Sequence, residues 1–163
     1  MTVAIDAATP ADVPVLMTLI GELAEFERLA HEVVVTEASL AEALFGPRPA
    51  VETVLAHVGG EVAGFALYFH NFSTFIGRRG LFLEDLYVRP AFRGRGVGKA
   101  LLVRVARLAA ERDCGRLEWA VLNWNRRAIG FYESIGARPI NDWTVYRLDR
   151  AALDALRSPA DGG

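Results

Sequence analysis

The chain has 163 residues, of which 52% are hydrophobic and 23% charged, and its formal net charge at pH 7 is -2. This composition excludes intrinsic disorder, and the small negative charge gives no support to nucleic-acid binding through overall basicity. The length suits one domain whose core needs no disulfide or metal.

The few cysteines and histidines limit the kinds of site that the chain can build. A single cysteine, Cys114, excludes an internal disulfide and a cysteine-based zinc site. The three histidines do not have metal-ligand spacing, so we expect no metal. No stretch approaches the ~20 apolar residues of a membrane span, and the first residues lack the order of a signal peptide. We expect a cytoplasmic protein that binds neither membrane nor nucleic acid.

The first part of the chain predicts a strand and two helices. Residues 3–7 have the pattern of a short strand. A helix follows, with Thr9 as its N-cap and Pro10 at its first position, and apolar residues recur at helical spacing. A second, shorter helix is predicted to begin near Thr36 and to end at Gly46.

The middle of the chain predicts three strands. Residues 51–58 and 61–70 read as a hairpin through Gly59-Gly60. A loop over 71–80 is expected to lead into a strand over 81–88. The remaining predicted elements are a helix over 97–112, a strand over 116–122, a helix over 125–135, a strand over 143–149 and one or two helical turns over 150–157. The whole predicts one α+β domain around a mixed sheet, ending in a disordered tail over 158–163.

The stretch RPAFRGRGVGKALL, residues 89–102, has the composition of an anion site. It is not an NTPase loop, because Lys99 is followed by Ala100 and no hydroxyl is left for magnesium. It is not the dinucleotide motif either, because the glycines at 94, 96 and 98 are spaced by two throughout.

What remains is the pattern R-x-x-G-x-G, filled by Arg93, Gly96 and Gly98 immediately before a helix. Glycines let the backbone approach a ligand closely, and the free N–H groups and dipole of a helix start attract negative charge. Arg93 suits a phosphate, which accepts two hydrogen bonds from one guanidinium, while Arg95 has a salt bridge to a neighbouring acid as an equal alternative. The pattern indicates a pyrophosphate site.

Two segments together resemble the GNAT superfamily of N-acetyltransferases: LEDLYVRPAFRGRGVGK, residues 83–99, and NWNRRAIGFYESIGA, residues 123–137. Within it, ELAEFE, FLEDLYV and a tryptophan at 143 resemble the diamine (spermidine/spermine) and thialysine acetyltransferase branch. The resemblance implies a GNAT-type domain over 1–157, with a mixed, mostly antiparallel sheet flanked by helices. It also implies acetyl-CoA as co-substrate and a homodimer.

The resemblance also implies where acetyl-CoA lies. Its pantetheine would add like a partial strand beside residues 86–88, and its pyrophosphate would lie at the glycine segment. The implied cofactor-binding residues are Leu86, Tyr87, Val88, Arg93, Gly94, Arg95, Gly96, Val97, Gly98, Lys99, Asn125, Ala128 and Tyr132.

Acetyl transfer to an amine needs a base for the ammonium and an acid for the leaving thiolate. Glu84 matches the branch's base, and Tyr132 matches its acid. Adjacent strand residues face opposite sides, so Glu84 and Asp85 are expected to diverge, and a salt bridge from Asp85 to an arginine is an equal alternative. Cys114 has no histidine beside it in sequence and is interpreted as a buried thiol, which favours direct attack in a ternary complex.

The expected substrate is the primary amine of a small molecule. The residues expected to bind it are Glu27, Glu84, Asp85, Trp124 and Asp142. Polyamine enzymes carry an aspartate in the loop before this strand, where the present chain has Arg78-Arg79 and no acid. This departure favours an amine with its own carboxylate, such as thialysine. A protein acetyltransferase, an antibiotic acetyltransferase and a non-catalytic acyl-CoA sensor remain alternatives.

Overall fold

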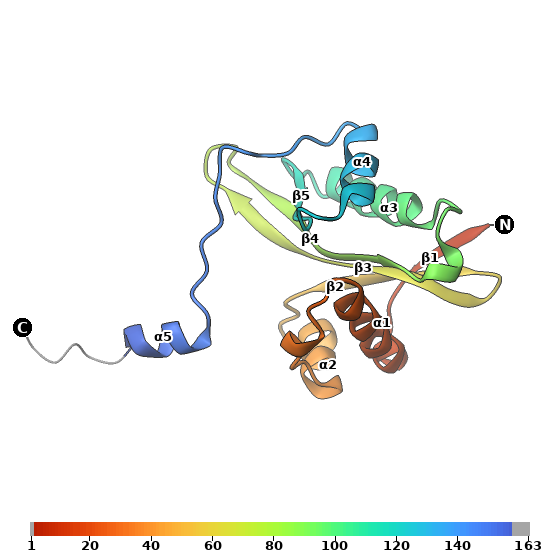
Figure 1. Cartoon of the computed structure of the whole chain (residues 1–163), viewed down its shortest axis with the longest axis horizontal. Helices are drawn as coiled ribbons and strands as arrows, with labels where there is room; N and C mark the ends of the chain where they lie inside the picture. The colour runs from red at the N-terminus through yellow and green to blue at the C-terminus, as the bar shows by residue number, and fades with distance from the viewer. Residues whose placement is uncertain (1, 158–163) are drawn as a thin grey trace, which may run out of the picture. The chain divides into compact units, whose positions relative to one another are not determined.

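The computed structural model describes residues 2–157, which fall into two compact units, one ending at Leu122 and the other beginning at Asn123. The first unit is built on one five-stranded sheet (Figure 1). Its strands stand in chain order: β1 (Val3–Ala7), β2 (Glu52–Val58), β3 (Glu61–Ser73), β4 (Arg78–Val88) and β5 (Leu117–Trp119). The first four pair antiparallel and β5 pairs parallel to β4, as predicted for a mixed, mostly antiparallel α+β fold.

Three helices cover the two faces of this sheet. α1 (Val13–Phe26) and α2 (Glu37–Phe45) lie on one face, and α3 (Val97–Glu111) lies on the other (Figure 1). The predicted helix start near Thr36 is confirmed, whereas Thr9 precedes a 3₁₀ turn and the N-cap of α1 is Asp12. The backbone N–H of Thr9 donates to the Asp12 carboxylate at 2.7 Å, and the hydroxyl of Thr36 accepts from the Ser39 N–H at 3.1 Å. The first turn after Thr9 is a 3₁₀ turn, so α1 itself begins only at Val13.

Apolar side chains fill the space between the sheet and each helical layer. α1 and α2 bury a cluster against residues of β2, β3 and β4, among them Leu16, Leu19, Leu55, Phe65 and Tyr87. On the other face α3 buries Val97, Leu101, Leu102, Val105 and Ala109. Burial of this area is the main term that stabilises the fold, and it fixes β4 between two rigid layers.

Two predicted strand boundaries are wrong. The expected loop over 71–80 is largely strand, because β3 continues to Ser73 and β4 starts at Arg78, leaving a four-residue turn over 74–77. Strand β5 is shorter than predicted, since its pairing with β4 stops at Leu83 opposite Trp119.

The second unit contains α4 (Arg126–Ser134) and α5 (Arg150–Arg157), both near their predicted positions. The strand predicted over 143–149 is wrong, because these residues form no regular element. A strand needs a neighbour for its N–H and C=O groups, and the described part of this unit contains no other strand. The tail over 158–163 lies outside the described residues, and the domain over 1–157 stays a prediction.

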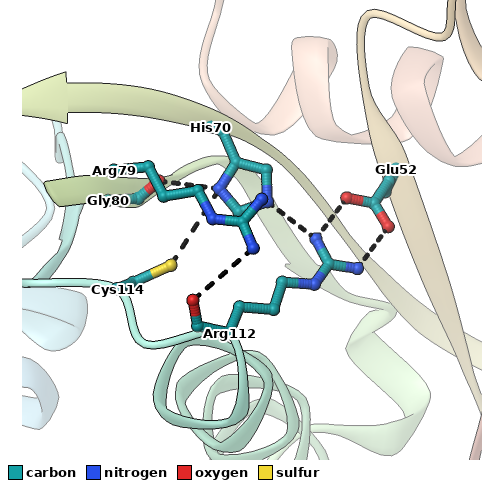
Figure 2. Close-up of polar contacts among 6 residues, drawn as sticks. All are labelled: Glu52, His70, Arg79, Gly80, Arg112 and Cys114. Atoms are coloured by element: carbon teal, nitrogen blue, oxygen red, sulfur yellow. Dashed lines mark hydrogen bonds and ion pairs between the residues drawn. The ribbon is translucent and has the colours of Figure 1, made fainter.

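A polar cluster joins the C-terminal end of α3 to three strands (Figure 2). The Arg112 guanidinium donates to both Glu52 carboxylate oxygens, at 2.6 and 2.7 Å, and its Nη1 lies 2.9 Å from His70 Nε2. The other ring nitrogen of His70 lies 3.0 Å from the Gly80 carbonyl oxygen. Because that carbonyl only accepts, Nδ1 carries the proton and Nε2 accepts from Arg112. The cluster therefore fixes α3 against β2, β3 and β4.

Cys114 was interpreted as a buried thiol with no histidine beside it in sequence, and the buried position is wrong. The residue is half-buried, and its Sγ lies 4.0 Å from His70 Nδ1 (Figure 2). The fold brings together residues 44 positions apart, which sequence adjacency does not reveal. Since the Nδ1 proton already points to Gly80, the ring is committed to the structural cluster.

Candidate active site

A β-bulge in β4 places the two acidic residues of the central strand. In the pairing of β3 with β4, Leu67 is opposite Asp85 and Tyr68 is opposite Leu83, so Glu84 is the extra residue. A bulge bends its strand and disrupts the alternation of side chains. The bulge interrupts the regular alternation on which the expectation of opposite faces for Glu84 and Asp85 rested, so that expectation stays a prediction.

Beyond the bulge, one edge of β4 has no strand beside it. β5 pairs only with Leu81–Leu83, and no other described strand pairs with that edge over Glu84–Val88. The opposite edge of Leu86, Tyr87 and Val88 is bonded to β3. An extended ligand can therefore add to the open edge as a further strand would, which suits the amide groups of pantetheine.

The glycine segment lies between the end of β4 and the start of α3. Gly94 and Gly96 have φ angles of 76° and 79°, values that favour glycine, and Gly96 is the N-cap of α3. The helix has no side-chain cap and no acidic residue in its first turn. Its first N–H groups are thus available to an anion, and Lys99 and Arg95 are exposed beside them. These features fit a pyrophosphate.

Arg93 does not extend freely from this segment. Its Nε donates to the Val88 carbonyl oxygen at 2.9 Å, and its guanidinium carbon lies 4.9 Å from the centre of the Phe26 ring and 5.7 Å from that of Tyr87. Arg95 lies over Phe92 at 5.8 Å, and neither arginine forms an ion pair with a described residue. The salt bridge offered as an alternative for Arg95 is therefore wrong within residues 2–157.

Three carboxylates, Glu27, Glu84 and Asp85, lie close enough for their charges to interact. Burial raises the pKa of Asp85 to about 7, and the negative charges of Glu84 and Glu27 add to this. Burial also raises the pKa of Glu27, with the Glu84 charge as the second cause. Asp85 forms no ion pair with any arginine of the described chain, so that alternative is wrong. Glu27, Glu84 and Asp85 therefore place negative charge near the end of α1, and negative charge is what an ammonium-binding site requires.

The first unit also contains an open hollow of about 690 Å³, which none of these three carboxylates lines. Its lining comes from the last turns of α1 and from the segment that follows β4: Glu22, Glu25, Phe26, Tyr87, Arg89, Pro90, Ala91, Phe92 and Arg93. Burial and the neighbouring Glu22 carboxylate raise the pKa of the Tyr87 phenol. Sequence reasoning named Glu27 but missed Glu22, Glu25 and Arg89, although Glu22, Glu25 and Phe26 have the spacing of one helix face.

The second unit holds the remaining predicted site residues. Asn125 caps α4, with its side-chain oxygen accepting from the Ala128 N–H at 3.2 Å. Tyr132 is half-buried on the same helix, and its ring centre lies 5.6 Å from that of Phe131. Trp124 and Asp142 are exposed, the former by 42%. The roles predicted for these five residues stay predictions.

The described residues contain neither a metal-binding cluster nor a membrane-spanning helix. Among residues 2–157, no group of three or more histidine, cysteine, aspartate or glutamate side chains is arranged to hold a metal ion. No helix in the part of the chain that the structure describes has the length and hydropathy needed to cross a bilayer.

The pattern of the acetyltransferase (GNAT) family matches residues 20–137 of this chain. The chain is 34% identical to the L-ornithine N5-acetyltransferase NATA1 of Arabidopsis thaliana, over 91% of this chain and 85% of that protein. It is 38% identical to a thialysine N-epsilon-acetyltransferase of Caenorhabditis elegans, over 90% and 91%. Among solved structures, an integron cassette protein of Vibrio cholerae superposes with a TM-score of 0.80, at 28% identity and 97% coverage of this chain and 99% of that one.

Proposed function

Since the chain belongs to the GNAT family and is an N-acetyltransferase, we propose that it transfers the acetyl group of acetyl-CoA to a primary amine of a small molecule. GNAT enzymes use acetyl-CoA as co-substrate. The observation that carries the proposal is the open edge of β4, which lies between an uncapped helix start and three interacting carboxylates.

The cofactor would lie along β4 and over the glycine segment. The backbone of Leu86, Tyr87 and Val88 would pair with pantetheine, and the N–H groups from Gly94 to Lys99 would hold the pyrophosphate. An N–H of the open edge would stabilise the oxyanion that forms when the thioester carbonyl is attacked.

The carboxylates would bind the ammonium group and remove its proton. Glu84 is the base expected from the sequence, but the structure favours Asp85, because a pKa of about 7 suits a base near neutral pH. Glu84 is exposed and, with Glu27, would hold the incoming cation. The neutral amine then attacks the carbonyl carbon directly, so that a C–N bond forms and the C–S bond breaks.

Tyr132 is proposed as the acid, as the family resemblance implies. The Tyr132 hydroxyl would give its proton to the departing thiolate, and Asn125 and Ala128 would support the thiol end of the cofactor. Because Asn125 caps α4, its loss would also loosen the helix that carries Tyr132.

The amine is proposed to be that of a small amino acid or short diamine. The relatives named above act on ornithine and on thialysine, each of which carries a carboxylate beside its amines. The acid that polyamine enzymes carry before the central strand is absent here, and Arg78 is paired with Asp113 at 2.7 Å instead. A long polycation therefore lacks one partner. We also propose that the enzyme is a homodimer, which sedimentation velocity tests.

A panel of amines with acetyl-CoA and a readout of free thiol tests this function. We expect turnover of thialysine, ornithine and short diamines, with kcat/KM above that for spermidine and spermine by up to about tenfold, the effect of one exposed charge contact. Aminoglycosides and lysine-containing peptides test the two alternative acetyltransferases. Binding of acetyl-CoA without turnover of any amine would leave a non-catalytic acyl-CoA sensor.

A further inference from the structure

The lining of the hollow includes one positive and one negative side chain that form no ion pair within residues 2–157. Glu22 and Arg89 neutralise each other at 3.1 Å, and Arg89 also donates to the Val62 carbonyl oxygen at 3.2 Å. Arg93 and Glu25 also line the hollow, and neither forms an ion pair with any residue from 2 to 157. A ligand that satisfies both must itself carry both charges.

Arg93 is held in place before a ligand arrives. One nitrogen donates to the Val88 carbonyl oxygen, and the guanidinium lies over the Phe26 and Tyr87 rings. This arrangement limits the rotation of a long side chain and leaves its two terminal nitrogens as donors. A planar guanidinium fixed in this way matches the two oxygens of a carboxylate.

Glu25 faces the same hollow from α1. It lies three residues after Glu22 and one before Phe26, both of which also line the hollow. Its carboxylate is exposed, so an ammonium group can reach it from solvent. Arg93 and Glu25 together offer the two contacts that the α-carbon end of an amino acid requires.

The distance from the hollow to the carboxylates of Glu27, Glu84 and Asp85 follows from the positions of these residues in the chain. Asp85 precedes Tyr87 by two residues on β4, which in an extended strand is about 6.6 Å. Glu27 directly follows Phe26. A basic amino acid with three or four atoms between its α-carbon and its terminal amine spans this separation.

We propose that the hollow binds the α-carbon end of a basic amino acid substrate, with Arg93 holding the α-carboxylate and Glu25 the α-ammonium. The terminal amine then lies at Glu27, Glu84 and Asp85. The inference rests on the proposed amine acetyltransferase function and makes Arg93 and Glu25 the residues that select an amino acid over a diamine.

Three substrates distinguish the Arg93 contact from the Glu25 contact. Ornithine carries both the α-carboxylate and the α-ammonium. Putrescine lacks the carboxylate, and 5-aminopentanoate lacks the α-ammonium. Arg93→Gln should lower kcat/KM for ornithine and 5-aminopentanoate relative to putrescine by about tenfold. Glu25→Gln should lower kcat/KM for ornithine and putrescine relative to 5-aminopentanoate by a smaller factor of about three, because Glu25 is exposed. Each result is a ratio within one variant, so an effect on cofactor binding or folding cancels.

Arg95→Gln is the matched control, because Arg95 carries the same charge in the same segment but does not line the hollow. It should change the rates with all three amines in the same proportion. If Arg93→Gln also changes all three alike, Arg93 serves the cofactor or the fold and the inference is wrong. If Arg93→Gln itself does not fold, the Glu25→Gln ratio decides. If the wild-type protein acetylates none of the amines in the panel, the proposed function itself fails.

Discussion

Arg112 at the end of α3 and Glu52 at the start of β2, 60 residues apart, form a pair with two hydrogen bonds. The pKa of Glu52 is lowered chiefly by the hydrogen bonds from Arg112, which outweigh partial burial. A carboxyl whose pKa is lower in the folded than in the unfolded protein adds stability above the unfolded pKa, near 4.5, and loses it as pH falls through the folded value.

Glu52→Gln should therefore lower the free energy of unfolding at pH 7 by about 1 kcal/mol, a figure reduced for solvent exposure. The difference from wild type should shrink as pH falls below about 4.5. Urea unfolding at several pH values measures both. Arg78→Met is the control, because it removes a more exposed pair, with side chains 54% and 81% accessible, and should have little effect. A loss for Glu52→Gln that is the same at every pH would mean that its charge is not involved.

Asp85 should have the opposite effect on stability. Its pKa is raised from 3.8 to about 7 by burial and by two neighbouring carboxylates. Between these values the folded protein keeps a proton that the unfolded chain releases, so stability falls as pH rises. Asp85→Asn should therefore stabilise the protein increasingly from about pH 4 to about pH 7 and by a constant amount above. This amount is at most about 4 kcal/mol. Thermal unfolding at several pH values across this range measures the effect. If the stabilities of wild type and variant change with pH in parallel, the prediction is wrong.

Asp85 should also determine how kcat/KM falls on the acidic side of its pH profile. If Asp85 takes the proton of the amine, kcat/KM should rise with pH through about 7, and Asp85→Asn should abolish that rise. Glu84→Gln should mainly raise KM and keep the rise. The reverse result would restore Glu84 as the base expected from the sequence.

The cofactor site can be tested by thermal shift. Acetyl-CoA should raise Tm in proportion to ln(1 + [L]/Kd). Gly98→Glu should abolish the rise, because it adds a negative charge in the first turn of α3, and a Cβ there would meet only Val88 at 3.6 Å. Val103→Glu adds the same charge at an exposed position of the same helix and should keep the rise. An unchanged shift in folded Gly98→Glu would place the cofactor elsewhere.

Removing the Tyr132 hydroxyl should reduce turnover without weakening cofactor binding. Tyr132→Phe keeps the ring and should lower kcat by roughly a hundredfold, the lower range of general acid catalysis. A thiol with a pKa near ~8.5 leaves without help at high pH, so the defect should shrink as pH rises. Phe131→Leu disturbs the neighbouring ring but no hydroxyl and should not show that pH dependence. Weaker acetyl-CoA binding at normal kcat would assign Tyr132 to packing.

Local signals predicted most of the helices and their starting points. The caps at Thr9 and Thr36 depend on side chains three residues away, and the turn at Gly59-Gly60 depends on adjacent residues. The glycine segment was predicted for the same reason, since its backbone conformation is a property of those glycines.

Features that depend on distant pairing were not predictable. The bulge at Glu84 arises from the register of β3 against β4, and the pairing of the short β5 with β4 stops at Leu83, one residue before that bulge. The segment 143–149 has strand-forming residues, but propensity does not supply a pairing partner. The hollow combines α1 with a segment more than 60 positions later, so no spacing rule connects Glu25 with Arg93.

The order of strands in the sheet has a consequence for how the chain acquires its structure. Because β2, β3 and β4 are consecutive neighbours joined by turns of two and four residues, their contacts close short loops. We expect residues 52–88 to gain protection from hydrogen exchange first during refolding, with α3 and β5 docking later onto a sheet that already exists. During synthesis all residues of this three-stranded meander are translated before the glycine segment.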